Sequence, residues 1–286
     1  MSSTLYLKNS SLTVSISTMG AELQSVRSSD GVDYLWCGDP SVWSGRAPIM
    51  FPICGALKDN AFIHNEKEYS LTKHGFAKLC EFDVIESDDT HAVFRLTSSD
   101  ELRQRYPFDF IFDVSYTLSG NSLLVEYRTE NTGVDTMYFS VGAHEAYSTP
   151  EGIEQYTVTF EKEEKLYATD LDGVLLSKKS TKILDEGRVL ALKQEHFAID
   201  ALIFRDIKSK SVTLSHKDGK RSIKVDFDGF DNLLLWTKPN AKFLCIEPWC
   251  GIPDFSDADG ILSHKAGITS LMAKKQFSRR HTITFS

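Results

Sequence analysis

The stretch FDVSYTLSGNSLLVEYRT, residues 112–129, decides the fold class. Apolar and polar residues alternate on both sides of a central SGN, residues 119–121. Alternation with a period of two is typical of a β-strand with one buried face, and Gly and Asn suit the backbone of a tight turn. The stretch therefore predicts two antiparallel strands joined as a hairpin.

The same alternation recurs along the chain, with turn residues between many of the runs. Further strands are predicted at residues 5–8, 12–17, 92–97, 157–160, 212–215, 223–227, 233–237, 243–247 and 281–285, and turns at residues 29–31, 131–133, 172–173 and 217–219. One short helix is predicted over residues 99–105, where Ser99 or Asp100 caps its start and Pro107 stops it. The pattern indicates an all-β fold of antiparallel sheets.

Length and composition limit the class of protein. The 286 residues show no linker and no internal repeat, so we expect one domain over residues 1–286. A net charge of −8 argues against a nucleic-acid partner. The chain has no leader-like start and no apolar run of about 18 residues, so we expect no membrane partner and a cytoplasmic protein. Five cysteines without a CxxC pair argue against a disulfide framework and a thiolate zinc site.

Two apolar segments interrupt the strand pattern. Residues 44–55, SGRAPIMFPICG, contain two prolines and are predicted to form a packed loop. Residues 247–254, EPWCGIPD, are predicted to leave a strand through Pro, Trp and Gly. Such exits from a rigid scaffold often carry functional side chains.

Three residues at the ends of strand-like runs form a candidate acid/base site: His74, His144 and Glu247. Two imidazoles beside a carboxylate offer proton donors and acceptors near neutral pH. Each residue also has a structural interpretation. Either histidine can be held by a backbone group, and Glu247 can be a buried carboxylate paired with Arg46.

Other side chains are candidates for ligand binding. Arg46 offers a planar fork of donors to hydroxyls, a carboxylate or a phosphate, or is a surface arginine. Aromatic rings can stack on a sugar or belong to the core; these are Phe76, Tyr147, Trp236 and Trp249. The remaining histidines are expected at the surface: His64, His91, His196, His216, His264 and His281.

Metal and nucleotide chemistry have little support in the sequence. His74, His144 and Glu247 match the ligand types of a catalytic zinc, but their spacing matches no zinc motif. The motifs HExxH, GxSxG and GxxxxGK[ST] are absent, as is GxGxxG between a strand and a helix. We therefore predict no metal site.

In the order of its motifs, the chain resembles the aldose 1-epimerases, or galactose mutarotase-like proteins, and within them the LacX-like branch. The motifs are GAEL (residues 20–23), RAPIMFPICG (46–55), HGFA (74–77), GAH (142–144), IEPW (246–249) and KAGI (265–268). The resemblance implies a β-supersandwich of large antiparallel sheets with a sugar cleft. It also implies interconversion of the α and β anomers of an aldose without a cofactor.

The resemblance further implies roles for individual residues. Glu247 is the expected general base at the anomeric hydroxyl, and His144 the expected general acid at the ring oxygen. His74 and Arg46 are expected to hold the sugar, and Asp200 is expected to bind it. The expected partner is a small-molecule sugar, and the oligomeric state is left open.

Two alternatives accompany this hypothesis. A hexose-6-phosphate 1-epimerase would add a cationic phosphate subsite, to which Arg46, Lys73 and Lys78 are candidates. A non-catalytic carbohydrate sensor or binding module would bind the sugar without accelerating anomer exchange. Glu145 stands where the family often has proline, and its charge is expected to alter the pocket or to disfavour anionic sugars.

Overall fold

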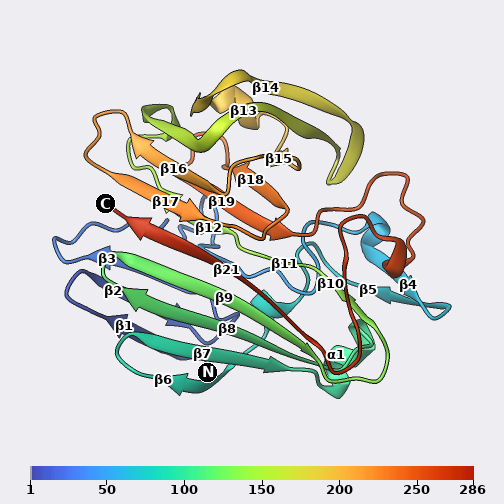
Figure 1. Cartoon of the computed structure of the whole chain (residues 1–286). Coiled ribbons are helices and arrows are strands. Elements are labelled where there is room, and N and C mark those ends of the chain that lie inside the picture. The colour runs from blue at the N-terminus through green and yellow to red at the C-terminus, as the bar shows by residue number, and fades with distance from the viewer. Residues whose placement is uncertain (1) are drawn as a thin grey trace.

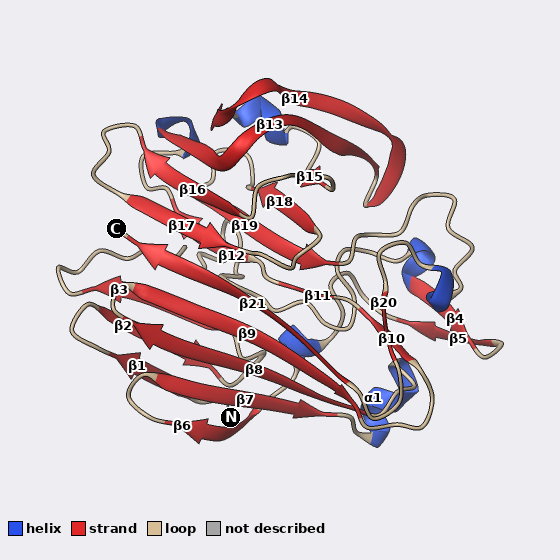
Figure 2. Ribbon diagram, in the orientation of Figure 1, coloured by secondary structure: helices blue, strands red, loops and turns tan. Residues whose placement is uncertain are grey.

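The structure, a computed structural model, describes residues 2–286, and most of its regular elements are strands (Figure 2). The largest sheet has nine antiparallel strands in the order β14-β13-β16-β17-β21-β9-β8-β7-β6. They are β6 (Asp83–Ser87), β7 (His91–Thr97), β8 (Phe110–Ser119), β9 (Ser122–Asn131), β13 (Tyr156–Asp172), β14 (Leu175–Ala191), β16 (Ser211–His216), β17 (Ser222–Asp226) and β21 (Gln276–Phe285). Strands β8 and β9 pair from Phe112 with Thr129 to Leu118 with Leu123, which confirms the predicted hairpin.

A second sheet carries Glu247, and His144 lies in a break between two of its strands. Its order is β11-β19-β18-β15, and β12 also pairs with β19. Its strands are β11 (Val141–Gly142), β12 (Glu145–Ser148), β15 (Leu202–Phe204), β18 (Asn232–Trp236) and β19 (Phe243–Cys250). Smaller sheets join β1 (Thr4–Lys8), β2 (Leu12–Ser17) and β3 (Leu23–Ser28), β4 (Ala61–His64) with β5 (Lys67–Ser70), and β10 (Met137–Phe139) with β20 (Thr269–Leu271).

Helices are few and short. The α-helix α1 (Asp100–Arg105) confirms the predicted helix, and the Ser99 hydroxyl accepts a hydrogen bond from Leu102 N at 3.2 Å as its cap. The 3₁₀ turns are η1 (Lys58–Asn60), η2 (Ala77–Leu79), η3 (Ile153–Gln155), η4 (Gln194–Phe197) and η5 (Leu262–His264). None of the helices within residues 2–286 has the length and apolar character that a membrane span requires.

The hydrophobic core lies between the nine-stranded sheet and the shorter strands behind it (Figure 1). The inward residues of β8 and β9, among them Phe112 and Val125, are fully buried. Leu244 and Ile246 face the same core from β19. Because side chains alternate along a strand, Cys245 and Glu247 lie on the opposite face of β19. The second sheet thus has one face in the core and one toward a cavity.

Strand β19 continues to Cys250, beyond Glu247, where the chain was expected to leave the strand. It pairs with β18 through Pro248 and Trp249 and with β11 through Cys250, so the predicted exit at Glu247 is wrong. The Pro248 carbonyl accepts a hydrogen bond from Ala143 N at 3.1 Å, in the break between β11 and β12. Proline has no N–H, but an N–H at this position would point into the same break, so no strand-to-strand hydrogen bond is lost there.

Candidate active site

A cavity of about 490 Å³ opens on the outer face of the second sheet. Its walls come from the loops of residues 43–55 and 73–79, from the tip of the β13–β14 hairpin, from residues 200–203 and from strands β18 and β19. These segments are far apart in sequence, so the fold alone brings their side chains together. His74, His144, Asp200, Glu247 and Trp249 all line this cavity.

Glu247 lies on the floor of the cavity, on β19 opposite Leu234 of β18. Its side chain is only 2% exposed, and Oε2 has no hydrogen-bond partner within residues 2–286. Burial raises the pKa of this carboxyl well above its usual value, while Lys73 acts in the opposite direction and Asp200 and Glu145 add to the increase. Glu247 therefore holds a proton more readily than an exposed glutamate.

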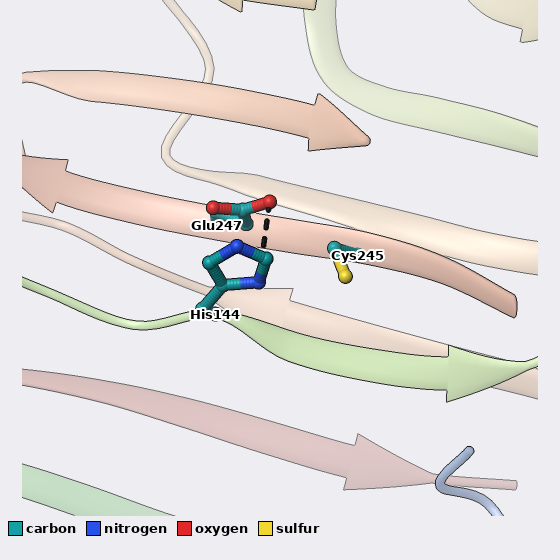
Figure 3. Close-up of side chains that lie close together, drawn as sticks. All are labelled: His144, Cys245 and Glu247. Atoms are coloured by element: carbon teal, nitrogen blue, oxygen red, sulfur yellow. Dashed lines mark ion pairs between the residues drawn. The ribbon is translucent and has the colours of Figure 1, made fainter. Parts of the chain in front are cut away.

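His144 faces Glu247 from the break between β11 and β12 (Figure 3). Its Nδ1 lies 3.4 Å from Glu247 Oε1, but the two atoms are not aligned as a hydrogen bond. The ring stacks on Trp43 with centroids 5.3 Å apart and meets the edge of Trp236 at 5.6 Å. Burial lowers the pKa of His144 to about 3, so the imidazole is neutral near pH 7.

His74 supplies a second neutral imidazole. Its ring lies edge-on to His144, with centroids 5.4 Å apart, and burial lowers its pKa well below the usual value. Its Nδ1 accepts a hydrogen bond from Gly55 N at 3.1 Å. The neutral ring therefore carries its proton on Nε2 and is a hydrogen-bond donor there.

The turn that presents His74 depends on Gly75. Both residues have positive φ, 69° at His74 and 70° at Gly75. A Cβ at Gly75 would lie 2.3 Å from the Phe51 carbonyl oxygen, so this position requires glycine. The hydrogen bond from His74 N to Gly55 O at 2.8 Å ties the same turn to the loop of residues 43–55.

Asp200 and Lys73 form a partly exposed pair at the cavity. Lys73 Nζ lies 3.8 Å from Asp200 Oδ2. Trp249 lies deeper, where its indole N–H donates to the Ala143 carbonyl at 3.1 Å and its ring meets the edge of His74. Trp249 thus fixes the segment just before His144 as well as lining the cavity.

Arg46, Phe76 and Tyr147 are not among the residues that line the cavity. The Arg46 guanidinium donates to the Gln24 carbonyl at 2.7 Å. Phe76 and Tyr147 are fully buried in the main hydrophobic core. The positive φ of Gly75 turns the chain, so His74 faces the cavity while Phe76 packs inward. The expectations of sugar contact at Phe76 and Arg46 therefore find no support in their placement.

Several residues that line the cavity were missed in the sequence. Trp43, Lys238 and Glu22 are among them. Tryptophan usage was an available signal, because three of the four tryptophans in the chain, Trp43, Trp236 and Trp249, line this one cavity. Glu22 had no such signal: its Oε1 accepts hydrogen bonds from Arg46 N and Ala47 N, each at 2.9 Å.

One cluster contains the donor types of a metal site. Donor atoms of His144, Cys245 and Glu247 lie within 4.8 Å of one another (Figure 3). A thiol must lose its proton to bind a metal, but burial raises the pKa of Cys245 well above its usual value, and Glu247 and Glu145 raise it further. Two remaining donors are fewer than a catalytic zinc usually has. We assign no metal to these residues.

The arrangement is suited to proton transfer. Glu247 and His144 are adjacent, buried and both favoured in their uncharged forms, so one can give a proton while the other accepts one. His74 adds a fixed donor beside them. Ordinary acid/base catalysis on a small polar molecule fits this set of groups.

Comparisons with known proteins agree with this geometry. The family model of aldose 1-epimerase matches residues 3–285. Protein LacX, encoded on a plasmid of Lactococcus lactis subsp. lactis, is 33% identical over 295 residues, covering 98% of this chain and 99% of LacX. A galactose mutarotase related enzyme from Lactobacillus acidophilus superposes with a TM-score of 0.94 at 30% identity, covering 99% of this chain and 97% of that one. A galactose mutarotase-like protein from Lactobacillus casei gives a TM-score of 0.95 at 27% identity, covering 99% and 100%. This chain belongs to the aldose 1-epimerase family.

Proposed function

We propose that this protein interconverts the α and β anomers of an aldose by opening and closing the sugar ring. The observation that carries the proposal is the separation of 3.4 Å between His144 Nδ1 and Glu247 Oε1 on the floor of the cavity. The anomeric oxygen and the ring oxygen of a sugar are both bonded to C1. Groups that serve these two oxygens must therefore be neighbours, as Glu247 and His144 are.

In the proposed reaction, Glu247 takes the proton from the anomeric hydroxyl while His144 gives a proton to the ring oxygen. The C1–O5 bond breaks, and C1 becomes the aldehyde carbon of the open chain. After rotation about C1–C2, the O5 hydroxyl returns its proton to His144 and attacks the other face of C1. Glu247 then protonates the new anomeric oxygen. No electron acceptor or other reactant is consumed.

The protonation preferences of the free site suit a reaction that runs in both directions. Each group must cycle between a protonated and an unprotonated form, and a group that strongly prefers one charged form does this poorly. Burial penalises the charged form of both Glu247 and His144. In the free site the proton of the pair therefore rests on Glu247, and ring opening would begin once it has passed to His144 across 3.4 Å, which leaves Glu247 as the base and His144 as the acid.

Three further residues are proposed to hold the sugar. His74 would donate from Nε2 to a sugar oxygen, since its Nδ1 is occupied by Gly55 N. Asp200 would accept from a hydroxyl beside Lys73. Trp249 would provide an apolar wall for the C–H face of the ring, as aromatic rings commonly do. Arg46 and Phe76 are not part of this proposed contact set.

The experiment that tests the proposal is an anomer-exchange screen. Freshly dissolved α-glucose and α-galactose are followed by polarimetry with and without the protein, and binding of the same sugars is measured by calorimetry. We expect exchange faster than the uncatalysed rate for at least one sugar. Binding without faster exchange would show a carbohydrate-binding protein instead and would refute the proposed activity.

A second candidate, action on a phosphorylated aldose, is favoured by the lysines of the cavity. Lys73, Lys78 and Lys238 all line it. Burial and the nearby Lys73 lower the pKa of Lys78, so its charged form is destabilised in the free protein. A bound phosphate would stabilise that charge. The test compares kcat/KM for glucose 6-phosphate and glucose. A preference for the phosphorylated sugar that is lost in Lys78→Met supports this candidate, and equal values in both proteins exclude it.

A further inference from the structure

A second carboxylate–histidine pair lies directly behind the proposed proton-transfer pair. Glu145 Oε1 and His281 Nε2 are 3.0 Å apart, and the two residues are only 4% and 1% exposed. Glu145 begins β12 in the second sheet, and His281 lies on β21 in the nine-stranded sheet. The pair therefore bridges the two sheets. This corrects the expectation that His281 lies at the surface. Glu145 does not itself line the cavity.

Glu145 directly follows His144 in the chain. Because side chains alternate along an extended strand, His144 faces the cavity and Glu145 faces the core. Glu145 lies opposite Ile246 of β19, whose side chain is in the core, while Glu247 is on the cavity face. The segment before His144 is fixed by Ala143, which donates to the Pro248 carbonyl and accepts from the Trp249 indole, each at 3.1 Å. The segment after His144 is fixed by Glu145. His144 thus lies between two anchors.

The surroundings of Glu145 make its position sensitive to its partner. Glu145 Oε2 and His281 Nδ1 have no hydrogen-bond partner within residues 2–286, and the hydroxyls of Tyr127 and Tyr147 are also unpartnered. The Tyr127 ring packs on His281 with centroids 5.8 Å apart. Because a buried carboxylate needs compensation, the single bond to His281 has a large share in holding Glu145 in place.

Glu145 also acts on the site through its charge. It is one of the groups that raise the pKa of Glu247, although burial of Glu247 is the larger cause. The titratable groups around Glu247 are Cys54, Lys73, His144, Glu145, Asp200 and Cys245. Those around Glu145 are Tyr116, Tyr127, Tyr147, Cys245, Glu247 and His281. Among these, Glu145 is the acidic group on the core side of the second sheet.

We propose that Glu145 is a positioning residue, whose pairing with His281 holds the start of β12 so that His144 stays opposite Glu247. The inference rests on the proposed anomer exchange, for which Glu145 would act through His144 and would not touch the sugar. A pair on the core side of the second sheet, Glu145 and His281, would thus support proton transfer on its cavity side.

The test uses Glu145→Gln, which keeps the shape of the side chain, removes its charge and replaces its charge-assisted hydrogen bond to His281 with a weaker neutral one. The matched control is Glu164→Gln, because Glu164 is an equally buried carboxylate that accepts hydrogen bonds from Ser209 and lies outside the cavity. Anomer exchange is measured for both, over a range of sugar concentration and pH. We expect Glu145→Gln to lower kcat by about 10- to 100-fold with little change in KM, as a small misplacement of a reacting group does.

The pH profile separates positioning from general destabilisation. Removing the negative charge of Glu145 lowers the pKa of Glu247, so the acid limb of kcat/KM should move to lower pH. The control should show neither change. If Glu145→Gln fails to fold, His281→Gln tests the same contact and should lower kcat in the same way. A Glu145→Gln protein with wild-type kcat and an unmoved acid limb overturns the inference, whereas an inactive wild-type protein would refute the proposed function instead.

Discussion

Two buried carboxylate–histidine pairs lie back to back across one sheet, and they differ in how their members meet. On the cavity side, His144 and Glu247 are 3.4 Å apart without an aligned hydrogen bond. On the core side, Glu145 and His281 form a hydrogen bond of 3.0 Å. An unbonded pair remains available to a substrate, whereas a bonded pair stabilises the fold. We therefore propose that the same residue types serve proton transfer on one face of the sheet and stability on the other.

The largest expected effect is on the cavity pair. His144→Gln should lower the rate of anomer exchange by about 10²–10⁴-fold, because one positioned proton-transfer group is lost. The sugar should still bind, since Asp200 and His74 remain. Anomer exchange by NMR and binding by calorimetry measure the two effects separately. Loss of binding equal to the loss of rate would mean that His144 only holds the sugar.

Breaking the core pair, Glu145 and His281, should lower the stability of the protein. His281→Ala leaves the Glu145 carboxylate buried without its partner, so we expect the free energy of unfolding to fall by about 3–5 kcal/mol. The control is His264→Ala, which removes an exposed contact to Asp259 of 2.8 Å and should lower stability far less, because exposed ion pairs contribute little. Urea denaturation measures both. Equal losses in the two variants would contradict the assigned role of the core pair.

The pH dependence of stability offers a finer test of the cavity pair. The pKa of His144 is lowered to about 3 in the folded protein, from about 6.5 when exposed. Its stabilising contribution is therefore complete above about pH 6.5 and is lost as pH falls toward 3. Glu247, whose pKa is raised, contributes in the opposite sense and loses its contribution as pH rises.

Melting temperatures measured from pH 7 to pH 4 should accordingly fall less in His144→Gln than in the wild-type protein. Parallel curves for the two proteins would show that His144 is not held neutral by the fold.

The smallest expected effect concerns the ring that covers His144. Trp43→Phe keeps an aromatic ring on the imidazole, from which Trp43 lies 5.3 Å between centroids, but removes part of the apolar cavity wall that we expect Trp43 to offer to the sugar. We expect KM to rise by roughly two- to tenfold, which corresponds to about 0.5–1.5 kcal/mol of stacking, with kcat little changed. A larger fall in kcat than rise in KM, measured by polarimetry, would show that Trp43 orients His144 instead of contacting the sugar.

Period-two alternation was enough to predict the central hairpin of β8 and β9, but the longest hairpin escaped it. Only residues 157–160 of β13 were predicted as a strand, whereas β13 and β14 each have 17 residues. Residues 161–165 are all charged, and register shifts near Glu164 break the alternation. Because β14 is an edge strand with mostly exposed side chains, no buried face marks it in the sequence.

Part of the lining of the candidate site could be predicted from residue type alone. His74, His144 and Glu247 were found because imidazoles and a carboxylate ended strand-like runs, and all three line the cavity. His281 was misjudged although its signal was present: it alternates with Ile283 and Phe285, which face the core. The contact of Lys73 with Asp200 had no local signal, because only the tertiary fold brings these segments together.

The most direct test of the central claim is the rate of anomer exchange in Glu247→Gln, measured by NMR saturation transfer between the α and β anomeric protons. The amide has the shape of the carboxyl group but cannot exchange a proton in its place. We predict a folded protein, with the circular dichroism spectrum of the wild type, whose exchange rate is lower by at least about 10²-fold. A rate within a few-fold of the wild type would contradict the assignment of proton transfer to the cavity pair.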